Sequence, residues 1–198
     1  MDIQDEGGTL KEENDLLLGP TCKRRWAYAC SKALDEFLAL AYYDEKGLPV
    51  IITRLFNTVG PRQTGRYGMV IPTFVTSALL GKPLSVFGTG EQSRNFTHVD
   101  DVVSAMIALM ECPGAEGQIF NIGNSEEITI NELAKKVIEF ANSKSTVEHI
   151  PYERAYGRGF EDMERRYPDL TKIEKFIGYR PQKSIDDIIR SVVDYYEK

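Results

Sequence analysis

The chain has 198 residues, and its 42% hydrophobic and 27% charged side chains are typical of a globular protein rather than a disordered one. The formal net charge of −6 argues against a nucleic-acid partner, because surfaces that bind nucleic acids are basic. No apolar run approaches the ~18 residues of a membrane span, and the acidic N-terminus does not resemble a signal peptide. The three cysteines lack metal-ligand or disulfide spacing, so we expect a cytoplasmic protein with no metal centre and no membrane contact.

The first half of the chain predicts helices that alternate with short strands. Residues 1–22 have the polar side chains and glycine breakers of a loop. Residues 48–55 form a β-branched run without alternation, which predicts a strand buried on both faces. A helix over 24–46 is predicted by apolar residues at helical spacing, namely Trp26, Cys30, Ala33, Phe37, Leu40 and Ala41. Further predicted elements are a helix over 70–80 and strands over 84–87 and 95–98.

The second half continues the alternation. Asp100 can cap a helix that runs to residue 111. Thr129 and Glu132 have the spacing of a capping box, which predicts the start of a helix that runs to residue 142. The remaining predicted elements are strands over 118–122 and 147–150, a charged loop over 151–168, and an amphipathic helix after Ser184. Helices that alternate with short apolar strands indicate the α/β class.

The glycine-rich signature of a dinucleotide-binding sheet is not found in its expected place. Such a sheet begins with a strand, a G-x-G-x-x-G turn and a helix. The G-x-G of Gly88 and Gly90 has Ser93 where the third glycine belongs, and it lies between two predicted strands. It is therefore not interpreted as a phosphate-binding turn.

Tyr28 and Lys32 are the first candidates for chemistry. Their (i, i+4) spacing places both side chains on one face of the predicted helix. A tyrosine has a pKa of about 10, and a neighbouring lysine favours the phenolate, so such a tyrosine could take a proton from a sugar hydroxyl. By itself the spacing is weak evidence, because a solvated pair on a surface helix has the same pattern.

Three later stretches accompany this pair: 54–62 (RLFNTVGPR), 90–101 (GEQSRNFTHVDD) and 120–124 (FNIGN). In order and spacing, the four motifs resemble the NAD-dependent epimerase/dehydratase family of extended short-chain dehydrogenases. The resemblance covers nearly the whole chain. It implies the end of a truncated Rossmann-like parallel sheet over 1–68, and a small α/β substrate-binding domain over 69–198, some segments of which return to the sheet.

The resemblance also implies roles for individual residues. Tyr28 would be the catalytic base, and Lys32 would be its partner and would hold the nicotinamide ribose of NAD. Asn57 and Arg94 would contact the diphosphate of a nucleotide sugar. The remaining implied substrate contacts are Val86 and Phe87, which would flank the nucleotide base, and Asp162, which would bind the ribose. Each of these substrate contacts has an ordinary alternative as a turn, core or surface residue.

The family reaction implied by the resemblance is hydride transfer from a sugar carbon to NAD. We favour 4-epimerisation of a UDP-sugar, with 4,6-dehydration or decarboxylation as alternatives, and a non-catalytic fragment that at most binds a sugar nucleotide as the alternative of another class. The glycine-rich turn and the catalytic Ser/Thr would lie upstream of Met1, so we expect the chain alone not to retain NAD. In relatives the helix of Tyr28 lies in a dimer interface, so a homodimer is also expected.

Overall fold

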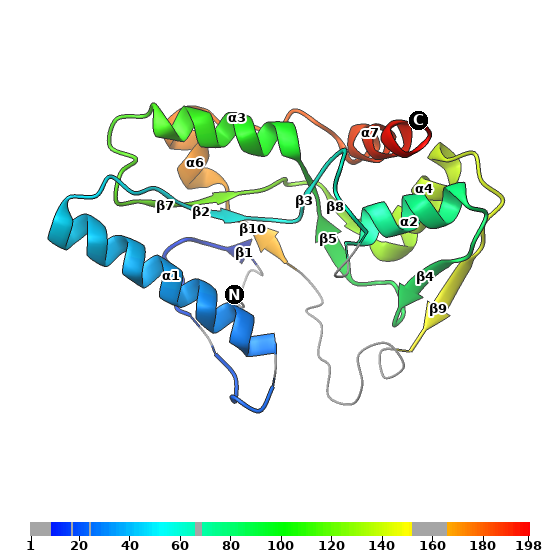
Figure 1. Cartoon of the computed structure of the whole chain (residues 1–198), viewed down its shortest axis with the longest axis horizontal. Coiled ribbons are helices and arrows are strands. Elements are labelled where there is room, and N and C mark those ends of the chain that lie inside the picture. The colour runs from blue at the N-terminus through cyan, green and yellow to red at the C-terminus, as the bar shows by residue number, and fades with distance from the viewer. Residues whose placement is uncertain (1–8, 17, 24, 66–68, 152–165) are drawn as a thin grey trace.

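One lobe of the molecule is built around a parallel pair of strands (Figure 1). The structure is a computed structural model that describes residues 9–16, 18–23, 25–65, 69–151 and 166–198. Strand β2 (Ile52–Leu55) pairs in parallel with β7 (Ile119–Ile122), and Arg54 lies opposite Asn121. Parallel strands joined through helices confirm the predicted α/β class.

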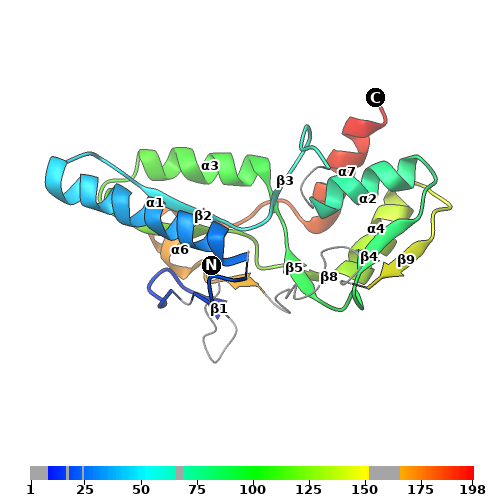
Figure 2. The same cartoon turned by 60° about the horizontal axis from the view of Figure 1, so that its bottom comes forward.

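The two faces of this strand pair are covered by different elements. Phe120 and Ile122 point to one face, where they pack with α3 (Val99–Met110) and α6 (Thr171–Ile177) in a common apolar cluster. Alternation along the strands turns Arg54 and Asn121 to the opposite face. There α1 (Arg25–Lys46) lies across the strands, as Figures 1 and 2 show.

The second lobe has its own core. It contains a parallel pair, β4 (Leu84–Phe87) with β9 (Val147–Ile150), and an antiparallel pair, β5 (Ser93–Asn95) with β8 (Glu127–Thr129). Three helices pack against each other and against these strands through buried aliphatic residues: α2 (Val70–Leu79), α4 (Ile130–Phe140) and α7 (Ile185–Tyr196). The capping box of Thr129 and Glu132 starts α4, as predicted, and a second box of Ser184 and Asp187 starts α7.

Asparagine side chains tie the strand ends of the two lobes together. The Asn57 amide donates to the Asn95 carbonyl at 2.8 Å, and the Asn95 amide donates to the Asn124 carbonyl at 2.7 Å. The Asn124 amide donates in turn to the carbonyl of Lys183, just before α7. Two short parallel pairs complete the connections, β3 (Thr58–Val59) with β6 (Thr97–His98) and β1 (Thr9–Leu10) with β10 (Tyr167–Pro168).

Several sequence predictions are wrong in detail. The run 48–55 is not buried on both faces, since Leu48 is 50% and Leu55 is 44% exposed. Its strand begins only at Ile52, and in the described part of the chain that strand has a partner on one edge only. Residues 1–22 are not wholly loop, because residues 9–10 form β1.

Three helices also differ from what the sequence predicts. Phe37, a member of the predicted apolar stripe of the first helix, is 65% exposed, whereas Ala29 and Ala33 are buried. The helix α3 begins at Val99, two residues earlier than predicted, and its cap is His98 rather than Asp100. The sequence does not predict α6, because its seven residues give too short a pattern. Within the described residues, no helix combines the length and hydrophobicity needed to cross a membrane.

Candidate active site

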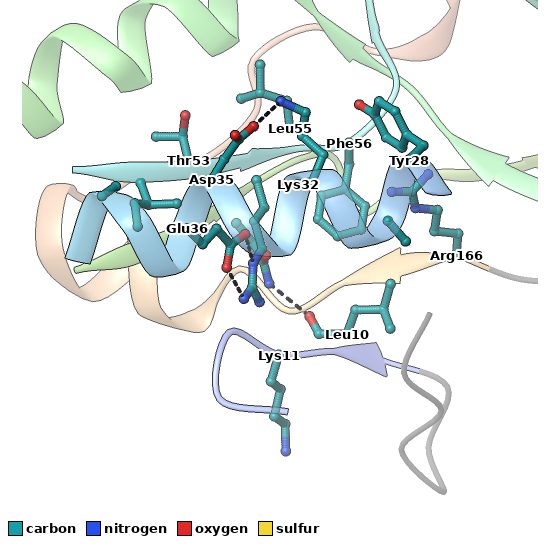
Figure 3. A pocket seen from close by; sticks show the side chains of 15 residues that line it. Leu10, Lys11, Tyr28, Lys32, Asp35, Glu36, Thr53, Leu55, Phe56 and Arg166 are labelled. Carbon is teal, nitrogen blue, oxygen red and sulfur yellow. Dashed lines mark hydrogen bonds and ion pairs between the residues drawn. The ribbon is translucent and has the colours of Figure 1, made fainter. Parts of the chain in front are cut away.

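Tyr28 and Lys32 lie side by side along α1, on the wall of a cavity of about 490 Å³ (Figure 3). Helix α1 forms the outer wall, and strand β2 with Phe56 forms the inner wall. The Tyr28 side chain is open to a ligand, since the residue is 70% exposed. The predicted pair therefore faces a space of the size that small-molecule sites occupy.

The Lys32 ammonium is held by a neighbour on its own helix. Its Nζ lies 2.6 Å from Asp35 Oδ2, and its side chain remains 54% exposed. The hydrogen bond and the charge of Asp35 raise the pKa of Lys32, and Tyr28 adds a smaller effect in the same direction. The Lys32 side chain therefore stays protonated beside the Tyr28 hydroxyl.

A network of polar side chains lies behind this pair, on the inner wall. The Arg54 guanidinium forms a two-pronged ion pair with Glu36, with Nε–Oε1 at 2.9 Å and Nη2–Oε2 at 2.7 Å. A third donor, Nη1, reaches the backbone carbonyl of Glu12 at 3.1 Å. The Glu12 carboxylate accepts the backbone N–H of Asn121 at 2.8 Å, and burial raises the pKa of Glu12. These contacts join α1, β2, β7 and the N-terminal segment.

The predicted substrate residues lie in other places. Asn57 follows β2 with a positive φ of 33°, and its amide is engaged by the Asn95 carbonyl. Arg94 stands next to Asn95 in β5 and donates to the Ser93 carbonyl at 2.7 Å, so Asn57 and Arg94 belong to one connected region. Val86 is fully buried in β4, which agrees with a core residue, and Phe87 beside it is half-buried. None of these four lines the cavity of Tyr28, and Asp162 lies outside the described residues.

His98 lies between a serine and an aspartate, which is an arrangement that catalytic histidines can have. Its Nε2 lies 3.2 Å from Ser191 Oγ, and its Nδ1 lies 3.4 Å from the Asp100 carboxylate. However, Nδ1 accepts the backbone N–H of Asp100, so the ring proton belongs on Nε2 and points to Ser191. The Ser191 hydroxyl donates to the helix carbonyl of Ile188. His98 therefore caps the start of α3 and connects it to α7.

Sequence reasoning missed the inner wall of the cavity. Arg54 carried the available signal, because a charged residue inside an apolar strand needs a partner. Glu36 carried another, since it continues the spacing of Tyr28 and Lys32 by four residues. Glu12 gave no local signal, because its contact with Asn121 joins residues far apart in the chain.

The parallel strand pairs of this α/β structure match the Rossmann-like fold of short-chain dehydrogenases. Residues 12–192 match the family described as GDP-mannose 4,6 dehydratase. The chain belongs to this NAD-dependent epimerase/dehydratase family.

Individual relatives cover several activities. The UDP-N-acetyl-alpha-D-glucosaminuronate decarboxylase of Bacillus cytotoxicus is 40% identical over 188 residues, which are 94% of this chain and 58% of that protein. The UDP-glucuronic acid 4-epimerase of Bacillus cereus, crystallised with NAD, has a TM-score of 0.80 at 26% identity, covering 96% of this chain and 56% of that chain. The dTDP-glucose 4,6-dehydratase of Bacillus anthracis, also in complex with NAD, has a TM-score of 0.79 at 30% identity, covering 98% and 57%. The chain thus spans little more than half the length of these relatives.

Proposed function

We propose that this chain supplies the proton-transfer and sugar-binding part of an NAD-dependent nucleotide-sugar epimerase, with 4-epimerisation of a UDP-sugar as its reaction. The observation that carries the proposal is the exposed Tyr28 phenol beside the Lys32 ammonium on the cavity wall. In this proposal the Tyr28 hydroxyl takes the proton of a sugar hydroxyl as general base, with the Lys32 ammonium beside it.

The residues present fit one end of the cofactor. Lys32 keeps two of its three ammonium donors beyond the bond to Asp35, which suits the hydroxyls of a ribose, and Tyr28 lies within the same wall. When bound, NAD would supply the acceptor for the hydride of the sugar carbon. The turn of Gly88 and Gly90 joins strand β4 to strand β5 and opens no helix, so it does not suit the pyrophosphate.

Asn57 and Arg94 are proposed to hold the diphosphate, and Val86, Phe87 and Asp162 the nucleoside. Support comes from the bond between Asn57 and the Asn95 carbonyl, which keeps the end of β2 against β5. A planar guanidinium suits a diphosphate, because it can donate two parallel hydrogen bonds. Cytoplasmic location and a homodimer remain predictions.

Decarboxylation of a UDP-hexuronate is a second candidate function. A specific observation favours it: the relative with 40% identity is a decarboxylase of a UDP-N-acetylglucosaminuronate. Oxidation of the sugar at C4 next to the carboxylated carbon can precede loss of CO₂, so Tyr28 and Lys32 would serve both reactions in the same way.

The test compares Tyr28→Phe with Tyr42→Phe in the full-length gene product, with NAD supplied. Tyr42 is an exposed tyrosine of the same helix that does not line the cavity. Product analysis from UDP-glucose reports 4-epimerisation, and CO₂ release from UDP-glucuronic acid reports decarboxylation. Loss of the Tyr28 hydroxyl should lower kcat at least about 100-fold while sugar-nucleotide binding survives.

Stability provides the second readout for these variants. Tyr28 is exposed, so the melting temperature of Tyr28→Phe should stay close to that of the wild type and of Tyr42→Phe. Normal turnover by Tyr28→Phe would remove Tyr28 as the base. Binding of the nucleotide sugars without any turnover by the wild type would favour the non-catalytic alternative.

A further inference from the structure

The helix that carries Tyr28 and Lys32 is held to the strands mainly by polar contact. Its buried residues near the pair are the small Ala29 and Ala33, and α1 contributes no residue to the three apolar clusters of the described chain. Apolar residues on its other side, Leu34, Phe37 and Leu38, are 50–65% exposed. Among the described residues, apolar packing of this part of α1 consists of these alanines and of the Trp26 ring, which lies against Gly19 of the N-terminal segment rather than against the strands.

One ion pair of the described residues joins this helix directly to strand β2. Arg54 and Glu36 meet through two parallel hydrogen bonds of 2.9 and 2.7 Å, and each side chain is only 15% exposed. Two parallel bonds fix orientation as well as distance, because the guanidinium and the carboxylate must lie nearly in one plane. The third Arg54 bond, to the Glu12 carbonyl, holds the guanidinium in place from behind.

A second contact, farther along the helix, does not replace this pair. The Tyr43 ring lies over Gly117, where a Cβ would come within 2.5 Å of Tyr43 Cε1. Tyr43 is 15 residues from Tyr28, or about 22 Å along a helix with a rise of 1.5 Å per residue. Glu36 is 4 residues from Lys32 and 8 from Tyr28, or about 6 and 12 Å along the axis, so within the described chain it is the polar anchor to the strands nearest to the proposed chemistry.

We infer that Arg54 and Glu36 form a positioning pair, which sets the place of Tyr28 relative to the bound nucleotide sugar. The inference rests on the proposed function. Arg54 precedes Asn57 by three residues of the same strand and its extension, which is about 10 Å of chain. The pair thus links the helix of the proposed base to the strand that leads to the proposed diphosphate contact. Neither residue needs to touch the substrate.

Loss of the Arg54–Glu36 pair should therefore affect turnover without affecting binding of the nucleotide sugar. If the pair is broken, α1 can shift on the alanines while Asn57 keeps its bond to the Asn95 carbonyl. The base would then move and the diphosphate site would not. A misplacement of about 1 Å can lower a rate by about 100-fold, so kcat should fall while KM for the nucleotide sugar stays nearly constant.

The test uses Glu36→Gln and Arg54→Lys in the full-length gene product, with NAD and UDP-glucose or UDP-glucuronic acid. The glutamine side chain would present one amide N–H₂ to a guanidinium that needs two acceptors, and lysine cannot form the two-pronged contact. Glu174→Gln is the matched control, because Glu174 of α6 forms an exposed pair with Arg180, away from the cavity. Assays are run at a temperature at which circular dichroism shows every variant folded.

We expect kcat to fall at least about tenfold in Glu36→Gln and about threefold or more in Arg54→Lys, with KM within about twofold of the wild type. Glu174→Gln should keep both constants. Wild-type kcat in a folded Glu36→Gln, or a change confined to KM, would overturn the positioning role. If Glu36→Gln does not fold, Arg54→Lys decides by the same criteria. A Tyr28→Phe variant that turns over normally would instead refute the proposed function, so the two failures are distinguishable.

Discussion

Replacement of Gly90 by alanine should destabilise the second lobe more than the loss of a glycine alone explains. Gly90 has a φ of +77°, and a Cβ added there would lie 2.1 Å from Oδ1 of Asn131. The left-handed conformation costs alanine about 1–2 kcal/mol. Asn131 would also have to move, and its amide donates to the Thr89 carbonyl at 3.0 Å and to Glu91 Oε1 at 2.6 Å.

The second effect adds to the first. Each hydrogen bond contributes about 0.5–1.5 kcal/mol, and these two lie near the surface, so their disturbance adds about 1–2 kcal/mol. The expected total is about 2–4 kcal/mol, measured as the loss of unfolding free energy in urea. Gly81→Ala is the matched control, because Gly81 has a φ of +66° and nothing within 4 Å of an added Cβ. Gly81→Ala should therefore lower the free energy of unfolding only by the about 1–2 kcal/mol of the left-handed conformation.

A double-mutant cycle separates the two effects. In an Asn131→Ala background the clash is absent, so Gly90→Ala should cost no more than Gly81→Ala. Equal losses for Gly90→Ala and Gly81→Ala in the wild-type background would refute the reasoning. The turn matters for the site because it joins β4, which carries Phe87, to β5, which carries Arg94.

Two further predictions concern single polar side chains. Burial raises the pKa of Glu12, so its contribution to stability is fully present below the pKa of the unfolded chain and is lost as pH rises through the folded pKa. Glu12→Gln keeps an acceptor for the Asn121 N–H and should raise the melting temperature at neutral pH but not in acid; a lower melting temperature at pH 7 would contradict this. Arg94→Lys should weaken UDP binding about five- to tenfold in titration calorimetry of the full-length gene product, because a point charge cannot donate a planar pair of bonds; unchanged affinity would return Arg94 to a surface role.

The sequence predicts the elements whose signals are local. The capping box of Thr129 and Glu132 marks the start of α4, and the apolar stripe after Ser184 marks α7. The two-residue strands give no such signal, because each exists only through a partner elsewhere, as Thr9 does opposite Tyr167. Pairing of residues so far apart leaves no pattern in a short window.

The candidate site also has a part that local sequence predicts and a part that depends on distant contacts. Tyr28 and Lys32 share one helix, so their spacing alone predicts that they lie on one face of it, and the structure shows that both line one cavity. The inner wall depends on tertiary contacts: Arg54 reaches Glu36 across 18 residues, and Asn121 reaches Glu12 across 109. The family motifs contain Arg54 and Asn121, but only the structure shows that both face α1 and the N-terminal segment rather than the apolar core.

Apolar spacing also explains why the prediction for α1 is wrong in part. A stripe of apolar residues shows which side of a helix favours contact with other apolar groups, but it does not show what covers that side. In α1 two residues of the predicted stripe, Cys30 and Phe37, stay exposed in the described chain, while Ala33 of the stripe, its neighbour Ala29 and the Glu36 carboxylate face the strands. A helix attached in this way depends on the direction of one ion pair for its placement. The most informative residue for the proposed chemistry is therefore the arginine within the apolar strand, since it connects the helix of the base to the strand that leads to the substrate contact.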